Sequence, residues 1–263
     1  MTAPVLYLPH GGGPMPLMND PAHAALIAFL RAIGTRYPKP AAIVLISGHW
    51  EARVPALNAA AQPALLFDYY GFPPETYQIT YPAPGKPELA MHIAELLRAG
   101  GFASELVRDR GYDHGVFVPL KLVYPDADVP IVQLSLIKGL DAAQHIALGR
   151  CLSPLREQDV AIVGSGMSFH NLQAIFAGER ADLRAASDRF DQWLRDTVTD
   201  PALSETARSE ALAQWQQAPY ARFCHPREEH LIPLHVCYGA ANAPGRVLFN
   251  EALMGHKVSG FGW

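Results

Sequence analysis

Histidines stand at the ends of several apolar runs in this chain. LYLPHGGG delivers His10, IVLISGHW delivers His49 and AIVGSGMSFHN delivers His170, while His230 in REEHLIPLH begins another apolar run. A buried strand brings its last side chains to the rim of an α/β sheet, where ligands bind, so imidazoles at several such ends can meet in space. Converging imidazoles are typical metal ligands, and we therefore expect a metal site among these histidines.

The glycines that follow His10 leave room for a ligand beside its ring. Three in a row, Gly11 to Gly13, allow a sharp turn without side chains. HGGGP matches neither GxGxxG nor GxxxxGK[ST], so a nucleotide site is not favoured. HGGG also occurs in the oxyanion loop of esterases, so a hydrolase function remains an alternative. The nucleophile motif GxSxG of those enzymes is not matched, because Ser165 in GSGMS stands one place too early.

Other residues beside the histidines could support such a site. His114 in GYDHGVFVPL follows Asp113, which could fix its tautomer, and precedes an apolar helix; a helix-capping role fits it equally well. Asn171 could hold the ring of His170 or a ligand through its amide. Cys224 stands next to His225, but no activating pair is visible, and we interpret it as an ordinary thiol.

The elements that position these residues alternate along the chain. Apolar runs predict strands at 5–8, 41–47, 104–108, 129–136 and 160–164. Helical spacing predicts helices at 21–33, 87–98 and 142–152, and two more within 181–213. The aromatic and proline-rich segment 66–86 has neither period and should be an ordered surface loop that walls a pocket.

Composition sets further limits. The chain has 263 residues, 49% of them hydrophobic, and a net charge of −4, so it can bury the core of one large domain. Lys and Arg form no basic patch, which argues against a nucleic-acid partner. No apolar stretch is long enough to cross a membrane and no signal peptide is visible, so we expect a cytoplasmic protein. Three widely spaced cysteines suit neither a disulfide framework nor a metal clip.

Six motifs together resemble a known family. LPHGGGPMPL, ISGHWE, DHGVFVPL, GSGMSFHNL, PREEHLIPL and SGFGW look like the class III extradiol ring-cleaving dioxygenases of the 4,5-DOPA dioxygenase type, in the same order and nearly end to end. The resemblance implies an α/β fold, a single catalytic domain over 1–263 with a central mixed, mostly parallel sheet flanked by helices. It also implies a non-haem iron(II) site that opens a catechol ring with O2.

The resemblance assigns roles to particular residues. His10, His49 and His230 would hold the metal, and His170 would be the acid/base beside it, with a fourth metal contact left open. His114 would face the substrate. The wider class often binds its metal with two histidines and one carboxylate, whereas here the third position is His230. Glu229 is the neighbouring carboxylate that could serve as a ligand there instead. Aromatic residues near the site are expected to face the substrate ring: Trp50, Tyr69 and Tyr77, with Tyr70 and Phe72 as further candidates.

Two other functions remain open at this stage. Neutral imidazoles suit Zn(II) as well as Fe(II), so the isolated protein could carry zinc, and a zinc-dependent hydrolase is one alternative. A non-catalytic metal-binding module on the same scaffold, as in Memo proteins, is the other. The sequence places no lone Arg or Lys in the pocket to bind a DOPA carboxylate, so the catechol is not identified. The oligomeric state is equally open.

Overall fold

A mixed sheet runs through the centre of the computed structural model, which describes residues 2–178 and 180–263. Within these residues the sheet has eight strands in the order β4-β3-β5-β2-β6-β1-β8-β7. The strands are β1 (Val5–Pro9), β2 (Ala42–Ala52), β3 (Ala56–Asn58), β4 (Glu105–Val107), β5 (Ile131–Ile137), β6 (Val160–Gly166), β7 (Arg246–Leu253) and β8 (His256–Gly262). The four central strands β5, β2, β6 and β1 are parallel, whereas β3 is antiparallel to β5 and β8 to β1.

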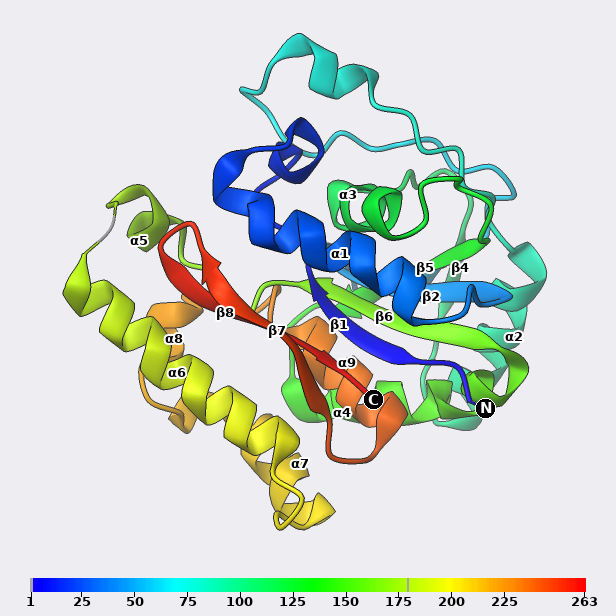
Figure 1. The fold of residues 1–263 in the computed structure, drawn as a ribbon. Helices are drawn as coiled ribbons and strands as arrows, with labels where there is room; N and C mark the ends of the chain where they lie inside the picture. The colour runs from blue at the N-terminus through cyan, green and yellow to red at the C-terminus, as the bar shows by residue number, and fades with distance from the viewer. Residues whose placement is uncertain (1, 179) are drawn as a thin grey trace.

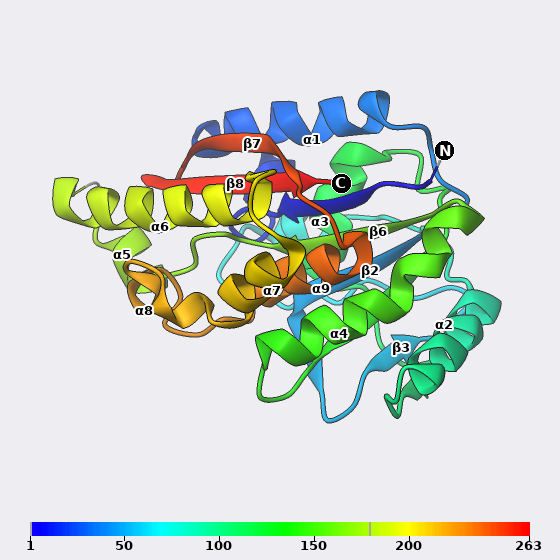
Figure 2. The ribbon, with the colours of Figure 1, turned by 90° about the horizontal axis from the view of Figure 1, so that it is seen from below.

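Helices cover both faces of this sheet (Figures 1 and 2). The α-helices are α1 (Ala24–Arg36), α2 (Pro87–Ala99), α3 (His114–Val123), α4 (Ala142–Leu152), α5 (Leu172–Phe176), α6 (Ala181–Thr199), α7 (Glu205–Ala213), α8 (Ala221–Cys224) and α9 (Ile232–Ala241). Helices α1 and α3 lie on one face, and α2, α4 and α9 on the other, while α6 packs against β8. The predicted fold class, α/β with a mostly parallel mixed sheet flanked by helices, is confirmed.

Short 3₁₀ helices complete the chain between these elements. They are η1 (Met15–Met18), η2 (Pro21–His23), η3 (Pro74–Gln78), η4 (Ser153–Gln158) and η5 (Trp215–Gln217). Asp20 caps η2, since its carboxylate accepts a hydrogen bond from the backbone N–H of Ala22. None of the helices in the described ranges combines the length and the apolar character that crossing a bilayer requires.

Parallel pairing brings the carboxyl ends of β1, β2 and β6 to one edge of the sheet. Pro9 pairs with Gly166, and Ser47 pairs with Ser165. The pairing of β2 with β5 shifts register between Ile46 and Glu51, and such irregularities re-aim side chains next to functional sites. This edge therefore presents the residues that follow β1 and β6, and those after Ser47 within β2, to a common space.

Each predicted strand and helix has a counterpart in the structure, and the strands that were not predicted lie toward the two ends of the sheet. The predicted helix 142–152 coincides with α4, and the predicted helices within 181–213 are α6 and α7. The predicted strand 41–47 continues to residue 52 in β2, and loop 66–86 contains η3. The sequence analysis did not predict β3, β7 or β8. In β7 polar and half-exposed residues interrupt the apolar pattern, so no buried-strand signal exists there.

Candidate metal centre

His10 lies directly after β1, and its side chain is buried. Its Nδ1 lies 2.9 Å from the hydroxyl of Ser165 in β6, and that hydroxyl donates to the carbonyl oxygen of Gly115 at 2.5 Å. A hydroxyl has one proton to donate, so Nδ1 of His10 must be the donor to Ser165. The lone pair of His10 is therefore on Nε2. The glycine turn beyond is held by His23, whose Nε2 accepts a hydrogen bond from the backbone N–H of Gly12.

His49 belongs to the last part of β2, beyond its register shift. Its Nδ1 lies 3.5 Å from Oδ2 of Asp68. A carboxylate attracts an N–H and repels a lone pair, so this approach favours the tautomer of His49 with the proton on Nδ1 and the lone pair on Nε2. The Nε2 atom lies 3.3 Å from Nε2 of His10.

His230 lies in the turn before α9, pressed against the end of β6. Its carbonyl oxygen accepts a hydrogen bond from the backbone N–H of Met167 at 3.0 Å. A Cβ on Gly166 would lie 2.1 Å from that carbonyl, so only glycine allows the approach. Nδ1 of His230 lies 2.9 Å from Oε1 of Glu229, which fixes the proton there, and Nε2 lies 3.2 Å from Nε2 of His49.

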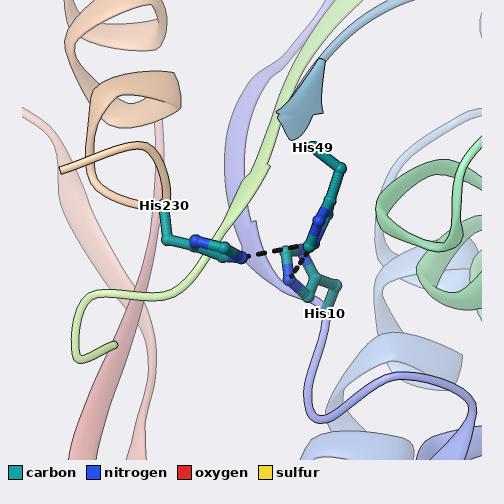
Figure 3. Close-up of side chains that lie close together, drawn as sticks. All are labelled: His10, His49 and His230. Atoms are coloured by element: carbon teal, nitrogen blue, oxygen red, sulfur yellow. Dashed lines mark hydrogen bonds between the residues drawn. The ribbon is translucent and has the colours of Figure 1, made fainter. Parts of the chain in front are cut away.

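The three imidazoles point toward one another, with His49 in contact with both of the others (Figure 3). Because the proton of each ring is on Nδ1, the neighbouring Nε2 atoms are all hydrogen-bond acceptors and cannot bond to one another. Burial and the neighbouring histidines lower the pKa of His10 and of His230 well below the ordinary value, and burial followed by His114 lowers that of His49 to about 4. Three unprotonated nitrogens facing one space repel one another unless a cation lies between them.

This donor set fits a divalent metal ion. The ligand atoms of His10, His49 and His230 all lie within 4.8 Å of one another. The Nδ1 atoms of His10 and His230 are hydrogen-bonded to a hydroxyl and a carboxylate, and Nδ1 of His49 faces the carboxylate of Asp68. Such outer partners are how proteins orient metal-bound histidines. Neutral imidazoles suit Fe(II) and Zn(II) alike, so the donor set by itself does not select the metal.

Two carboxylates flank the three histidines and each joins one of them to a further histidine. Asp68 accepts hydrogen bonds from Nδ1 of His114 at 2.8 Å and from its backbone N–H at 3.0 Å, besides facing His49. Burial alone would raise the pKa of Asp68, but the hydrogen bond and charge of His114 outweigh it and lower the pKa to about 2. We call His49, Asp68 and His114 the Asp68 triad.

The second carboxylate is Glu229, whose Oε1 lies 2.9 Å from Nδ1 of His230 and 3.2 Å from Nδ1 of His170. Burial raises its pKa, but the hydrogen bond from His170 is foremost among the contacts that bring the pKa below the ordinary value. The rings of His170 and His230 stack at 3.5 Å. We call His170, Glu229 and His230 the Glu229 triad. The two carboxylates carry two negative charges, which complement a divalent cation.

The carboxylate that orients His114 is Asp68, and the prediction that Asp113 does so is wrong. Asp113 does not orient His114; it accepts hydrogen bonds from Ser47 at 2.7 Å and Arg110 at 3.1 Å. Asp113 precedes the first residue of α3 and points into the sheet, whereas Asp68 arrives from the aromatic loop. Asp68 is one of two acidic residues in that loop, the other being Glu75, and the sequence does not distinguish them. Asn171 caps α5 by accepting from the N–H of Ala174, so it does not hold the ring of His170.

A cavity of about 480 Å³ opens above the metal site. Tyr69 lines it, as do His10 and the four histidines of the two triads. Trp50 lies outside this lining because successive strand residues point to opposite faces, and its ring packs under Arg110 instead. Tyr77 is also outside; its ring contacts Tyr69 from behind. Of the three aromatics predicted to face the substrate, the structure thus brings Tyr69 alone to the cavity.

Other histidines and a cysteine close to these segments in the sequence, His225, His235 and Cys224, lie in structural environments instead. Nε2 of His225 lies 2.9 Å from the carbonyl oxygen of Ser168, and Nε2 of His235 lies 2.9 Å from that of Leu212. Burial raises the pKa of the Cys224 thiol, which is the opposite of what a reactive thiol needs. These groups do not join the metal site.

Comparison with known families places the chain in an enzyme class. Residues 4–262 match the family described as the catalytic LigB subunit of aromatic ring-opening dioxygenase. The chain belongs to this family and is an aromatic ring-opening dioxygenase of the extradiol type. The resemblance inferred from the sequence motifs is confirmed. Enzymes of this family depend on a metal, in agreement with the histidine cluster.

Individual relatives cover nearly the whole chain. Dioxygenase tasH of Hapsidospora irregularis is 40% identical over 285 residues, covering 99% of this chain and 85% of the relative. The 4,5-DOPA dioxygenase extradiol of Beta vulgaris is 38% identical and covers 93% of this chain and 90% of its own. The crystal structure of an uncharacterized Escherichia coli K12 protein superposes with a TM-score of 0.80 at 28% identity, covering 99% of both chains.

Proposed function

We propose that this enzyme uses Fe(II) held by His10, His49 and His230 to open a catechol ring by extradiol cleavage with O2. The observation that supports this most strongly is the convergence of three Nε2 atoms from rings whose Nδ1 atoms each face a hydroxyl or a carboxylate. The ion would supply a common binding point for both catechol oxygens and O2 and a path for electrons between them. The isolated protein could carry Zn(II) on the same ligands.

We further propose that His170 is the acid/base. A catechol must lose protons when both of its oxygens bind a metal, and ring opening requires a proton in return, which suits a histidine. His170 lines the cavity above the metal site and also a surface pocket that it shares with Asn171 and Arg227, so it can exchange protons with solvent. Its Nδ1 faces Glu229, which keeps the ring oriented and leaves Nε2 to act.

His114 has a different proposed role, that of holding the bound substrate or oxygen. Its side chain is 8% exposed and its Nδ1–H is bound to Asp68. A ring so enclosed exchanges protons with solvent poorly, but its Nε2 is well fixed for a hydrogen bond. Tyr69 packs edge-on against His114, and we propose that it walls the substrate ring.

The wider proposal covers the chain as one catalytic domain, 1–263, located in the cytoplasm, with a catechol and O2 as its small-molecule partners. Neither a nucleic acid nor a membrane is a proposed partner. The hydrolase and the non-catalytic module are not retained, because the matched family and the named relatives are dioxygenases.

The test is anaerobic reconstitution with Fe(II), followed by oxygen-electrode assays of a catechol panel. We expect iron-dependent O2 uptake and a yellow ring-opened product. His170→Ala should retain iron but lose most turnover, whereas His92→Ala, at an exposed histidine of α2, should behave like the original protein. Full activity in His170→Ala would remove it from the mechanism, and no O2 uptake with any catechol would refute the proposed function.

A further inference from the structure

The walls of the cavity above the metal site are apolar. Beyond the histidines and the glycine turn, the lining consists of thioether, aromatic and aliphatic side chains: Met15, Met167, Met254, Tyr69, Tyr70, Phe72, Leu172, Ile175 and Phe176. None of the lining residues, all within the described ranges 2–178 and 180–263, is Lys, Arg, Asp or Glu. Beyond the histidines assigned to the metal site and to catalysis, a charged substituent on a substrate would find no oppositely charged side chain among these lining residues.

The cavity has space for more than a catechol ring. Its volume of about 480 Å³ falls within the range of about 300–1,000 Å³ typical of pockets for drug-sized ligands. Three methionines reach it from separate segments: Met15 after the glycine turn, Met167 after β6 and Met254 from the β7–β8 turn. Methionine adapts its shape to apolar partners, so these walls can follow a substituent of variable form.

The apolar character continues to the mouth of the cavity. Tyr70 is 91% exposed, Phe176 83% and Leu172 52%, and all three belong to the lining. Tyr70 comes from the aromatic loop, whereas Leu172 and Phe176 come from α5, so the exposed apolar rim is built from two segments. Arg180, just beyond α5, is paired with Asp182 at 2.8 Å. Exposed apolar groups gathered around an opening mark a binding path.

We propose that the substrate is a catechol whose ring substituent is an uncharged, apolar alkyl or aryl group, and that Met254 and the rim contact this substituent. The proposal rests on the proposed ring-opening function. Burying an ammonium or carboxylate without a partner costs much free energy, whereas burying methylenes in such walls is favourable. This distinguishes the chain from an enzyme selective for an amino-acid side chain on the catechol.

The first test compares kcat/KM of the iron-loaded enzyme for unsubstituted catechol, 4-methyl-, 4-butyl- and 4-hexylcatechol, dopamine, 3,4-dihydroxyphenylacetate and DOPA. Each buried methylene should raise kcat/KM by about three- to fourfold. The charged catechols should fall at least about tenfold below an apolar catechol of similar size. Higher kcat/KM for any charged catechol than for 4-butylcatechol would overturn the proposal. If unsubstituted catechol and all others are inert, the proposed function fails instead.

The second test measures binding without turnover. Calorimetric titration of the zinc-loaded protein, in which no oxygen chemistry takes place, should give tighter binding of 4-butylcatechol than of DOPA by at least about tenfold. Equal or reversed affinities would contradict the proposal even if every catechol is oxidised.

A variant pair locates the substituent. Met254→Gln keeps the length of the side chain but makes it polar, and it should lower the ratio of kcat/KM for 4-butylcatechol to that for catechol by about three- to tenfold. The matched control is Met91→Gln, at an exposed methionine of α2 that lines a different pocket. An unchanged ratio in Met254→Gln, or an equal change in Met91→Gln, would show that the substituent does not lie against Met254.

Discussion

The Asp68 triad and the Glu229 triad are built from the same kinds of group, but their outer histidines, His114 and His170, differ in access to solvent. Each contains a carboxylate that holds one candidate metal ligand and one further histidine. In the Asp68 triad the side chain of His114 is 8% exposed, and in the Glu229 triad that of His170 is 22% exposed. The enclosed ring of His114 suits a fixed hydrogen bond, and the more exposed ring of His170 suits proton exchange. Similar chemistry thus acquires different roles through burial.

The carboxylates are also stabilised in different ways. Asp68 accepts hydrogen bonds from the backbone and the side chain of His114, at the first residue of α3. Glu229 instead faces Arg227 at 3.4 Å, and Arg227 also pairs with Glu51. The Asp68 triad is tied to a helix end, whereas the Glu229 triad depends in part on a surface ion pair. We therefore expect the Asp68 triad to contribute more to the free energy of unfolding than the Glu229 triad.

The largest effect should come from removing one ligand from each triad. His49→Ala and His230→Ala should each weaken metal binding by more than the 10- to 100-fold expected for loss of an outer partner. Ser165→Ala, which loses the partner of His10, provides that smaller reference. Metal content after dialysis against a chelator measures this. A variant at either ligand that keeps its metal would show that the two triads do not contribute equally.

The next effect separates the two outer histidines. His170→Ala should lower kcat by about 10²–10⁴-fold, as for loss of a general acid/base. His114→Ala should lower it by about 10- to 100-fold, as for loss of one hydrogen bond to a charged group. The pH profile of kcat should lose a limb in His170→Ala alone. The reverse ranking would exchange the roles assigned to the two triads.

A smaller effect concerns acid stability. Folding lowers the pKa of Asp68 to about 2, so its contribution is present above its unfolded pKa near 4 and is lost as the pH falls from 4 through 2. It is worth about 2–3 kcal/mol. Asp68→Asn should therefore lower the free energy of unfolding of the metal-free protein at pH 7, measured with urea, and the deficit should vanish near pH 2. Glu229→Gln should have the same sign and a smaller size; a larger loss than in Asp68→Asn contradicts the comparison.

The smallest effect should follow Arg227→Met, because its ion pairs are exposed. Such pairs contribute about 0–1 kcal/mol. We expect little change in unfolding free energy and a few-fold lower kcat/KM as Glu229 loses a neighbour. Measuring kcat/KM of Arg227→Met and of the original protein at low and high salt tests this, since screening should reduce the difference between them. No change at any salt concentration would show that Glu229 does not need the guanidinium.

The sequence predicted the strand ends far better than the surroundings of the site. His10 and His49 were recognisable because each follows a buried apolar run, and the parallel pairing of β1, β2 and β6 brings the ends of these runs together. Asp68 was hidden because the aperiodic aromatic loop carries no local signal of where it packs. Trp50 was predicted to face the substrate, but strand alternation turns it away from the side on which His49 lies.

The cavity walls could not be predicted for a related reason. Met254 belongs to the turn of a hairpin whose strands were not predicted, and it reaches the cavity only because β8 pairs with β1 beside the metal site. The strands β7 and β8 depend on their antiparallel pairing with each other and with β1 more than on a pattern of their own. Features set by long-range packing were therefore accessible only from the structure.

The most direct test of the central claim is a crystal structure of the protein loaded anaerobically with Fe(II), with anomalous data at the iron edge. We predict one iron peak with Nε2 of His10, His49 and His230 each at about 2.1 Å. Nδ1 of these rings should keep its contacts with Ser165, Asp68 and Glu229. Iron bound elsewhere, or held through Nδ1 of any of the three, would contradict the account.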